Sequence, residues 1–159
     1  MQQNHHASPV CPCGGIPAGA RYAACCQPYI EGRDAAPTAE RLMRSRYSAY
    51  ALGHAEYVLA TWHPSTRPAD LTLAAPGTPH ATRWIRLAVH SHAQLTATES
   101  QVTFTATYRE DGRAHRMEEC SRFVLEGGRW FYLEGVSNFS NTDSEPICPP
   151  LSMTSTPDR

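Results

Sequence analysis

Four cysteines lie within the first 26 residues, as Cys11 and Cys13 around one proline and as the adjacent pair Cys25 and Cys26. Two thiol pairs separated by a short Gly-rich loop can close a tetrahedral four-sulfur site around zinc. A disulfide within either pair would be strained, because neighbouring cysteines do not reach the usual Cα separation of the bridge. Disulfides between the pairs, or four free structural cysteines, are the alternatives. We expect one structural zinc per chain, held by all four.

The loop between the two pairs begins with Gly14 and Gly15. Glycine adopts positive φ readily, so backbone N–H groups here can turn toward the thiolates of Cys11 and Cys13 and support them. The first nine residues are polar and contain no apolar run typical of a secretory signal. We therefore expect a cytoplasmic protein, in which thiolates remain reduced and bind metal.

Sequence order around these cysteines resembles a known motif. The chain reads Cys-Pro-Cys-Gly, then Arg-Tyr-Ala-Ala-Cys-Cys, then Pro28 and Tyr29. This order resembles the SEC-C zinc motif, which is also found at the carboxyl end of bacterial SecA. The 11 residues between Cys13 and Cys25 make this loop longer than in most such motifs, and loop closure tolerates that length. Near the other end of the chain only Cys148 is present, so we do not expect a second zinc site.

Two further stretches are similar to the bacterial YchJ family: residues 38–50, read as TAERLMRSRYSAY, and residues 119–135 with their Glu-Cys-Ser-Arg-Phe and Gly-Arg-Trp-Phe-Tyr runs. This resemblance implies a SEC-C motif followed by a domain like nuclear transport factor 2. That domain is a conical α+β fold with helices packed on a curved, mainly antiparallel sheet. We expect a flexible N-terminus at 1–10, the SEC-C motif at 11–30, the conical domain at 37–137 and a disordered tail at 138–159.

Composition limits the functions to consider. A net charge of −1 over 159 residues gives no general attraction to nucleic acid, and no apolar run approaches the length of a membrane span. All 14 basic residues are arginine, which excludes chemistry that needs a lysine nucleophile. Nucleic-acid and membrane partners are therefore not expected.

The first helix of the conical domain should place an arginine on its apolar side. Thr38 is a suitable N-cap and Gly53 a suitable end, and a second helix is expected over residues 54–62. On a helical wheel Arg46 falls at the centre of the apolar stripe, between Met43 and Tyr50. Either Arg46 meets a polar group inside the domain, or it reaches past the edge of the core to water.

Hairpin turns predict where that polar group would be. Asp-Gly at 111–112 and Gly-Gly at 127–128 indicate a three-stranded meander over residues 101–136, with a fourth strand over 83–95. If both loops have two residues, one apolar face of the sheet carries both Glu119 and Glu134. We therefore predict a polar cluster in an aromatic pocket under the first helix. Its candidate members are Arg46, Trp62, His63, Glu119, Tyr132 and Glu134.

Two classes of function fit these features. In the first, the protein is a binding or adaptor module: the SEC-C motif contacts another protein, and the cone holds a small ligand or forms a homodimer. In the alternative, the cone is the pocket of a small-molecule enzyme, similar to an isomerase or dehydratase, that uses a carboxylate base. The sequence offers no nucleophile motif or phosphate loop, so the binding class is favoured. A buried ion pair without any function would give the same pattern of charges.

Overall fold

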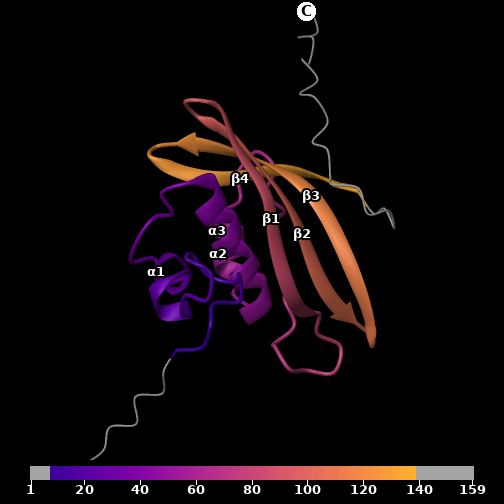
Figure 1. The fold of residues 1–159 in the computed structure, drawn as a ribbon. Coiled ribbons are helices and arrows are strands. Elements are labelled where there is room, and N and C mark those ends of the chain that lie inside the picture. Colours follow the sequence, from indigo (N-terminus) through magenta and orange to yellow (C-terminus); the bar gives the residue numbers. More distant parts are fainter. Residues whose placement is uncertain (1–7, 139–159) are drawn as a thin grey trace, which may run out of the picture.

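A computed structural model describes residues 8–138 of the chain (Figure 1). Its helical elements are η1 (Tyr22–Ala24), α1 (Gln27–Ile30), α2 (Ala39–Leu52) and α3 (Ala55–Ala60). Its strands are β1 (Arg83–Thr96), β2 (Glu99–Glu110), β3 (Arg113–Glu126) and β4 (Arg129–Asn138). Residues 1–7 of the predicted flexible N-terminus and residues 139–159 of the predicted tail, which include Cys148, lie outside the described residues, whereas Asn138 is the last residue of β4.

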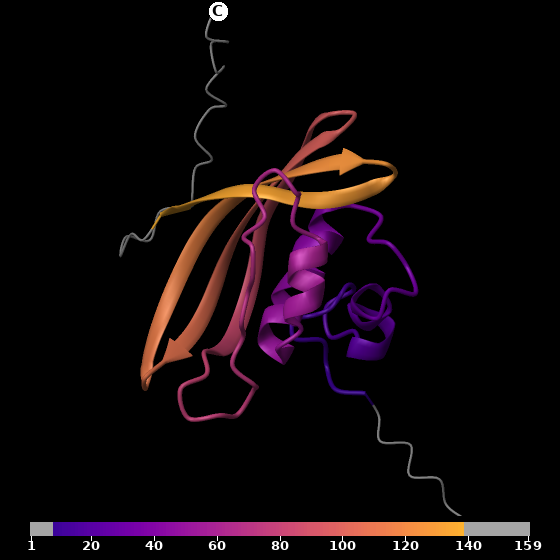
Figure 2. The ribbon, with the colours of Figure 1, turned by 180° about the vertical axis from the view of Figure 1, so that it is seen from behind.

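The four strands form one antiparallel sheet in the order β1-β2-β3-β4. The sheet curves around α2 and α3. The N-terminal module, which contains the four cysteines, η1 and α1, lies on the far side of these helices (Figures 1 and 2). This arrangement confirms the predicted α+β cone of helices on a curved antiparallel sheet. None of the helices within residues 8–138 is long and apolar enough to cross a membrane.

Helix α2 begins and ends where its sequence signals predict. The Thr38 hydroxyl accepts a hydrogen bond from the Arg41 N–H at 3.2 Å, which caps the first turn. At the other end Gly53 adopts a left-handed conformation with φ of 80°, and its N–H bonds back to the last turn. The helix therefore holds its side chains in a fixed rotation relative to the sheet.

Helix α3 is shorter than the expected 54–62, because the residues after it join the sheet. The Tyr132 N–H donates to the Thr61 carbonyl at 2.8 Å, and the His63 N–H donates to the Tyr132 carbonyl at 2.7 Å. These bonds form a short parallel bridge between Trp62 and Tyr132 at the edge of β4. Trp62 is thereby fixed against the sheet instead of completing a helical turn.

Both predicted two-residue hairpin loops are present, with positive φ at both central positions of each turn. They set the expected pairs, Glu110 with Arg113 and Glu126 with Arg129. Further along, however, β4 contains one extra residue. Phe123 pairs with Tyr132 while the preceding Arg122 pairs with Glu134, so Leu133 has no partner in β3.

This bulge changes which face the rest of β4 presents. Glu134 joins the row of Arg122 on the outer face, and Gly135 takes the inward position opposite Ser121. The prediction that Glu134 shares the inner face with Glu119 was therefore wrong.

Candidate metal centre and ligand cavity

The four N-terminal cysteines form one compact group of sulfurs. All four Sγ atoms lie within 4.8 Å of one another, and every cysteine of the group is buried. Their sulfurs are 3.6 Å apart between Cys13 and Cys25, 3.7 Å between Cys13 and Cys26, and 3.9 Å between Cys25 and Cys26. A tetrahedral zinc site with bonds of about 2.3 Å requires sulfurs about 3.8 Å apart. The donor set and its spacing therefore fit a zinc ion.

Backbone and side-chain groups around the sulfurs are arranged to support thiolates. The Gly15 N–H donates to the Cys13 sulfur at 3.3 Å, which confirms the predicted role of the glycine turn. Gly15 has φ of 87°, and a side chain there would collide with the backbone at Ala20. On the other side, the Ser48 hydroxyl of α2 lies 3.5 Å from the Cys11 sulfur.

The thiols also influence one another's ionisation. The pKa of Cys11 is lowered because Cys13 and then Cys26 hydrogen-bond to its sulfur. The interaction with Cys11 raises the pKa of Cys13 to about 12, with burial adding to the effect. Without a cation, the thiolate is thus favoured at Cys11 and disfavoured at Cys13 and Cys26. A divalent metal removes this restriction, because it stabilises all four thiolates together.

The N-terminal module packs directly against α2. Arg44 on α2 donates from Nη1 to the Cys13 carbonyl at 3.0 Å and pairs through Nε with Glu40 at 3.3 Å. The four cysteines belong to the same buried cluster as Leu42, Met43 and other core side chains of the cone. The metal centre and the conical domain therefore share one hydrophobic core.

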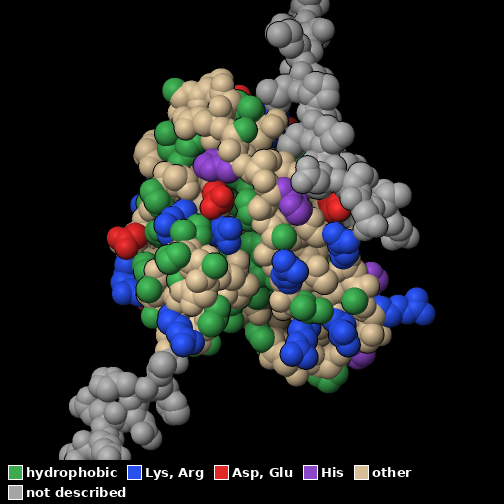
Figure 3. All heavy atoms as spheres, viewed as in Figure 1, with side chains coloured by type: hydrophobic (Ala, Val, Ile, Leu, Met, Phe, Trp, Pro, Cys, Tyr) green, Lys and Arg blue, Asp and Glu red, His purple; other side chains and the backbone are tan. Residues whose placement is uncertain are grey.

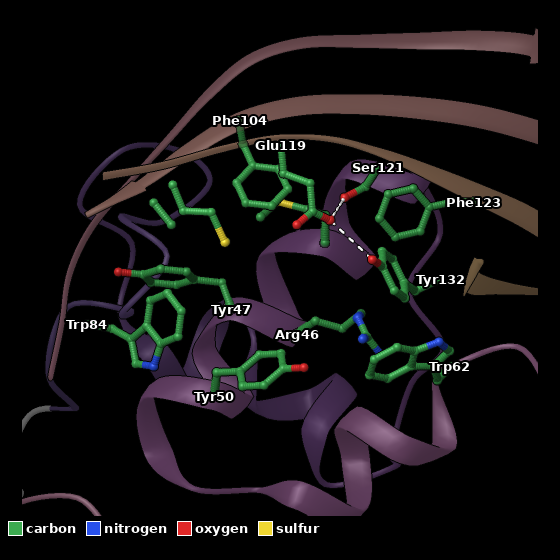
Figure 4. Close-up of a pocket in the computed structure, with 13 residues that line it drawn as sticks. Arg46, Tyr47, Tyr50, Trp62, Trp84, Phe104, Glu119, Ser121, Phe123 and Tyr132 are labelled. Atoms are coloured by element: carbon green, nitrogen blue, oxygen red, sulfur yellow. Dashed lines mark hydrogen bonds between the residues drawn. The ribbon is translucent and has the colours of Figure 1, made fainter. Parts of the chain in front are cut away.

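A cavity of about 350 Å³ lies between α2 and the concave face of the sheet (Figure 4). Aromatic and apolar side chains from the helix, the sheet and the segment after α3 form most of its wall, and three polar residues complete it. The lining residues are Met43, Arg46, Tyr47, Tyr50, Trp62, Trp84, Phe104, Ala106, Met117, Glu119, Ser121, Phe123 and Tyr132. A concave apolar site with few polar groups is typical of small-molecule pockets.

Arg46 points into this cavity from α2 and is only 6% exposed. Its Nη1 donates to the Val58 carbonyl at 2.7 Å and to the Thr61 hydroxyl at 2.8 Å. The guanidinium carbon also lies 4.5 Å from the ring centre of Tyr132 and 5.2 Å from that of Trp62. Burial lowers the pKa of Arg46. The prediction that Arg46 lies inside the domain is confirmed.

Glu119 occupies the opposite wall, on β3. Its Oε1 accepts hydrogen bonds from the Ser121 hydroxyl at 2.6 Å and from the Tyr132 hydroxyl at 3.2 Å (Figure 4). Burial, and then the negative charge of Glu119, raise the pKa of Tyr132, so this hydroxyl stays protonated as a donor. Gly135 leaves room for the carboxylate, because a Cβ at that position would overlap three atoms of the Glu119 side chain.

Two predicted pocket residues lie elsewhere. Glu134 is on the outer face, where its carboxylate pairs with Arg122 at 2.9 Å and its side chain is 54% exposed. His63 does not line the cavity: its Nε2 lies 2.7 Å from a carboxylate oxygen of Glu126 and its ring packs against Phe131. The structure thus brings Arg46, Trp62, Glu119 and Tyr132 to the cavity, without the other two.

Several wall residues were not among the predicted site residues. Tyr47 and Tyr50 extend the α2 side of the wall, and Trp84 of β1 packs against both rings with centroid distances of 5.5 and 6.0 Å. The spacing of Met43, Tyr47 and Tyr50 at three- and four-residue intervals is the signal that points to this helix face. No comparable signal in the sequence identifies Trp84, because it depends on how β1 pairs.

Comparisons with known proteins agree with this architecture. The family described as "YchJ, middle NTF2-like domain" matches residues 38–135. A UPF0225 protein of Polaromonas naphthalenivorans is 48% identical over 134 residues, covering 79% of this chain and 95% of that protein. Another, from Cupriavidus metallidurans, is 50% identical over 131 residues, covering 79% and 86%.

Two solved structures share the fold. A SEC-C motif containing protein from Rhodopseudomonas palustris superposes with a TM-score of 0.66 at 29% identity, covering 79% of this chain and 96% of that one. A second SEC-C motif containing protein, from Psychrobacter arcticus, gives a TM-score of 0.63 at 27% identity, covering 87% and 88%. The cysteine group, the cone and these similarities together show that the chain belongs to the YchJ (UPF0225) family, with a SEC-C motif and an NTF2-like domain.

Proposed function

We propose that this protein binds a small ligand in its cone and carries one structural zinc in its SEC-C motif. The observation that carries the proposal is the cavity of about 350 Å³, whose apolar wall includes a buried guanidinium. A charge placed inside an apolar cavity costs free energy of solvation, so its retention favours a role beyond packing. A polar anchor inside an aromatic wall is the usual composition of a ligand site.

Zinc is the metal that best suits the cysteine group. Four thiolates at tetrahedral spacing match the preference of zinc for sulfur ligands and leave no open position for water. The ion in such a site stabilises the fold and does not activate substrate. Its role in this protein is to hold the N-terminal module on α2.

The SEC-C motif also offers a surface for another protein. Its cysteines face α2, while the loop around residues 14–24 is largely solvent-exposed and Val10 is 49% exposed. Apolar side chains are visible among polar ones on this side of the molecule (Figure 3). Such a mixed surface suits contact with a cytoplasmic protein partner, and a homodimer is the other assembly to test.

Binding without turnover is favoured over enzymatic chemistry. Glu119 is the carboxylate in the described cavity wall, and it already accepts hydrogen bonds from Ser121 and Tyr132. No histidine is among the residues that line this cavity, since His63 is turned toward Glu126. A general base would therefore have to act without the proton-relay partner that such sites commonly use.

A thermal-shift screen of small metabolites with the zinc-loaded full chain tests the proposal. Compounds that raise the melting temperature should lose this effect in Ala106→Leu, because Ala106 is fully buried in the cavity wall and a larger side chain fills the space. Thr107→Leu is the matched control, since the neighbouring residue faces the other side of the sheet. Screening hits that persist in Ala106→Leu, or the absence of any hit, would contradict ligand binding in the cone.

A further inference from the structure

The Arg46 guanidinium has a defined set of N–H groups still available to a ligand. Arginine carries five N–H donors in one plane. The two on Nη1 are used by the Val58 carbonyl and the Thr61 hydroxyl. Within residues 8–138 neither Nε nor Nη2 makes a hydrogen bond, and they form the edge of the guanidinium that matches the two oxygens of a carboxylate.

Two aromatic rings already pack against the same guanidinium. Trp62 and Tyr132 lie within 5.2 Å of its central carbon, measured to their ring centres. These contacts limit rotation of the side chain. The cation is thus held in place before any ligand arrives, which lowers the entropy lost on binding.

No carboxylate among residues 8–138 forms an ion pair with Arg46; burial lowers the pKa of its guanidinium, and the negative charge of Glu119 partly offsets this. Among residues 8–138 none of the ion pairs within 4.0 Å involves Arg46. Glu119 is directed toward Ser121 and Tyr132 instead, in the space that Gly135 leaves open. The positive and negative charges of the cavity therefore occupy separate positions, one on α2 and one on β3.

The rest of the wall determines what the body of a ligand must be. Met43, Tyr50, Trp84, Phe104 and Phe123 present hydrocarbon to the cavity from both the helix and the sheet. With Glu119 already in the wall, a monocarboxylate adds one negative charge beside the Arg46 cation, whereas a phosphate dianion would add two. A cationic ligand would face the buried Arg46 without water between them.

We propose that the cavity binds a small apolar monocarboxylate, whose two oxygens accept from Nε and Nη2 of Arg46 while its hydrocarbon body packs on the aromatic wall. This assignment rests on the proposed ligand-binding function and names the chemical class. Ser121 and Tyr132 keep the Glu119 carboxylate directed away from the ligand carboxylate, so both anions fit in one cavity.

Matched probes on one carbon skeleton test the assignment in the zinc-loaded full chain. Hexanoate, octanoate and 3-phenylpropionate are titrated by calorimetry at pH 7, each beside its amide and its primary amine. For the skeletons that bind, the carboxylate should bind at least tenfold more tightly than its amide, and the amine should be weakest. Arg46→Lys should lose most of this preference, because lysine keeps the charge but lacks the planar pair of donors.

Arg41→Lys is the matched control, since Arg41 lies on the same helix and does not line the cavity. Its carboxylate preference should equal that of the unchanged protein. Amides or amines that bind as tightly as carboxylates would overturn the assignment while leaving ligand binding in place. If no probe binds and the metabolite screen also gives no hit, both proposals fail. Should Arg46→Lys not fold, the comparison of carboxylate with amide in the unchanged protein decides the matter.

Discussion

Replacing Gly135 by alanine should displace the Glu119 carboxylate from its position in the cavity wall. An added Cβ would overlap Oε1, Cδ and Cγ of Glu119, so rotating the carboxylate alone cannot relieve the collision. The side chain must leave, and the hydrogen bonds from Ser121 and Tyr132 are lost with it. Allowing for partial rehydration, we expect the free energy of unfolding to fall by about 2–3 kcal/mol.

A double-mutant cycle with Glu119→Ala isolates this interaction. In the Glu119→Ala background the obstacle is gone, so Gly135→Ala should change the free energy of unfolding by less than about 0.5 kcal/mol. The coupling energy between the two sites should therefore be about 2 kcal/mol, measured from urea unfolding of the four zinc-loaded proteins. Circular dichroism and tryptophan fluorescence should report the same transition.

Glu134→Ala provides the control, because Glu134 adjoins Gly135 in sequence but lies on the outer face with Arg122. Its coupling to Gly135→Ala should be near zero. Additive effects at Glu119 and Gly135, within about 0.5 kcal/mol, would refute the reasoning. Such a result would mean that Gly135 does not face Glu119 and that the bulge at Leu133 is absent.

The remaining predictions concern helix α2 and its neighbours. Arg46→Met should lower the free energy of unfolding, measured by urea denaturation, by about 1–3 kcal/mol. This is less than the loss of a buried ion pair would cost, because two hydrogen bonds and two ring contacts are lost and no acidic partner is left unpaired. A larger decrease would indicate such a partner. Metal analysis should find about one zinc per chain, because four thiolates complete the coordination of one ion. Cys25→Ser should lose the zinc and lower the melting temperature of the whole chain in one transition, because the cysteines share the core of the cone. Loss of metal with an unchanged melting temperature would contradict this. Tyr57→Phe should lower the free energy of unfolding by about 1 kcal/mol, because the Tyr57 hydroxyl bonds to Ser45 at 2.6 Å. Tyr47→Phe should lower it by less than about 0.5 kcal/mol, because the buried Tyr47 hydroxyl has no partner among the described residues. A larger decrease for Tyr47→Phe than for Tyr57→Phe in urea denaturation would refute this. Burial raises the pKa of both tyrosines to about 12, above about 10 in the unfolded chain. Their contribution to the free energy of unfolding is therefore complete below pH 10 and is lost as the pH rises from about 10 to about 12. Each phenylalanine variant should lose stability less steeply than the unchanged protein over that range.

The fold could be predicted from the sequence because its signals are local. Thr38 and Gly53 delimit α2, and the two hairpin turns need only residues that tolerate positive φ. The SEC-C motif is equally local, since its cysteines lie within 16 residues of one another. Each of these features depends on neighbours in the chain and needs no knowledge of tertiary packing.

The site was predictable only as far as these local signals extend. Helical periodicity placed Arg46 inside, and alternation from the hairpin turn placed Glu119 and Tyr132 on the same face. The bulge at Leu133 interrupts that alternation, and it lies where the chain after α3 meets β4: the Thr66 hydroxyl donates to the Leu133 carbonyl at 2.6 Å. Because this contact joins segments 67 residues apart, the turn sequence alone carries no sign of it.

Helix α2 connects the metal centre to the cavity. Its Ser48 lies against the Cys11 sulfur and its Arg44 bonds to the Cys13 carbonyl, while Arg46 and Tyr50, on another side of the helix, line the cavity. A rigid helix cannot move one of these sides without moving the other. The position of the guanidinium relative to Trp62 and Tyr132 therefore depends on how the N-terminal module holds α2. A closed four-sulfur site would thus serve the proposed ligand binding without contacting the ligand, by fixing the helix that carries Arg46.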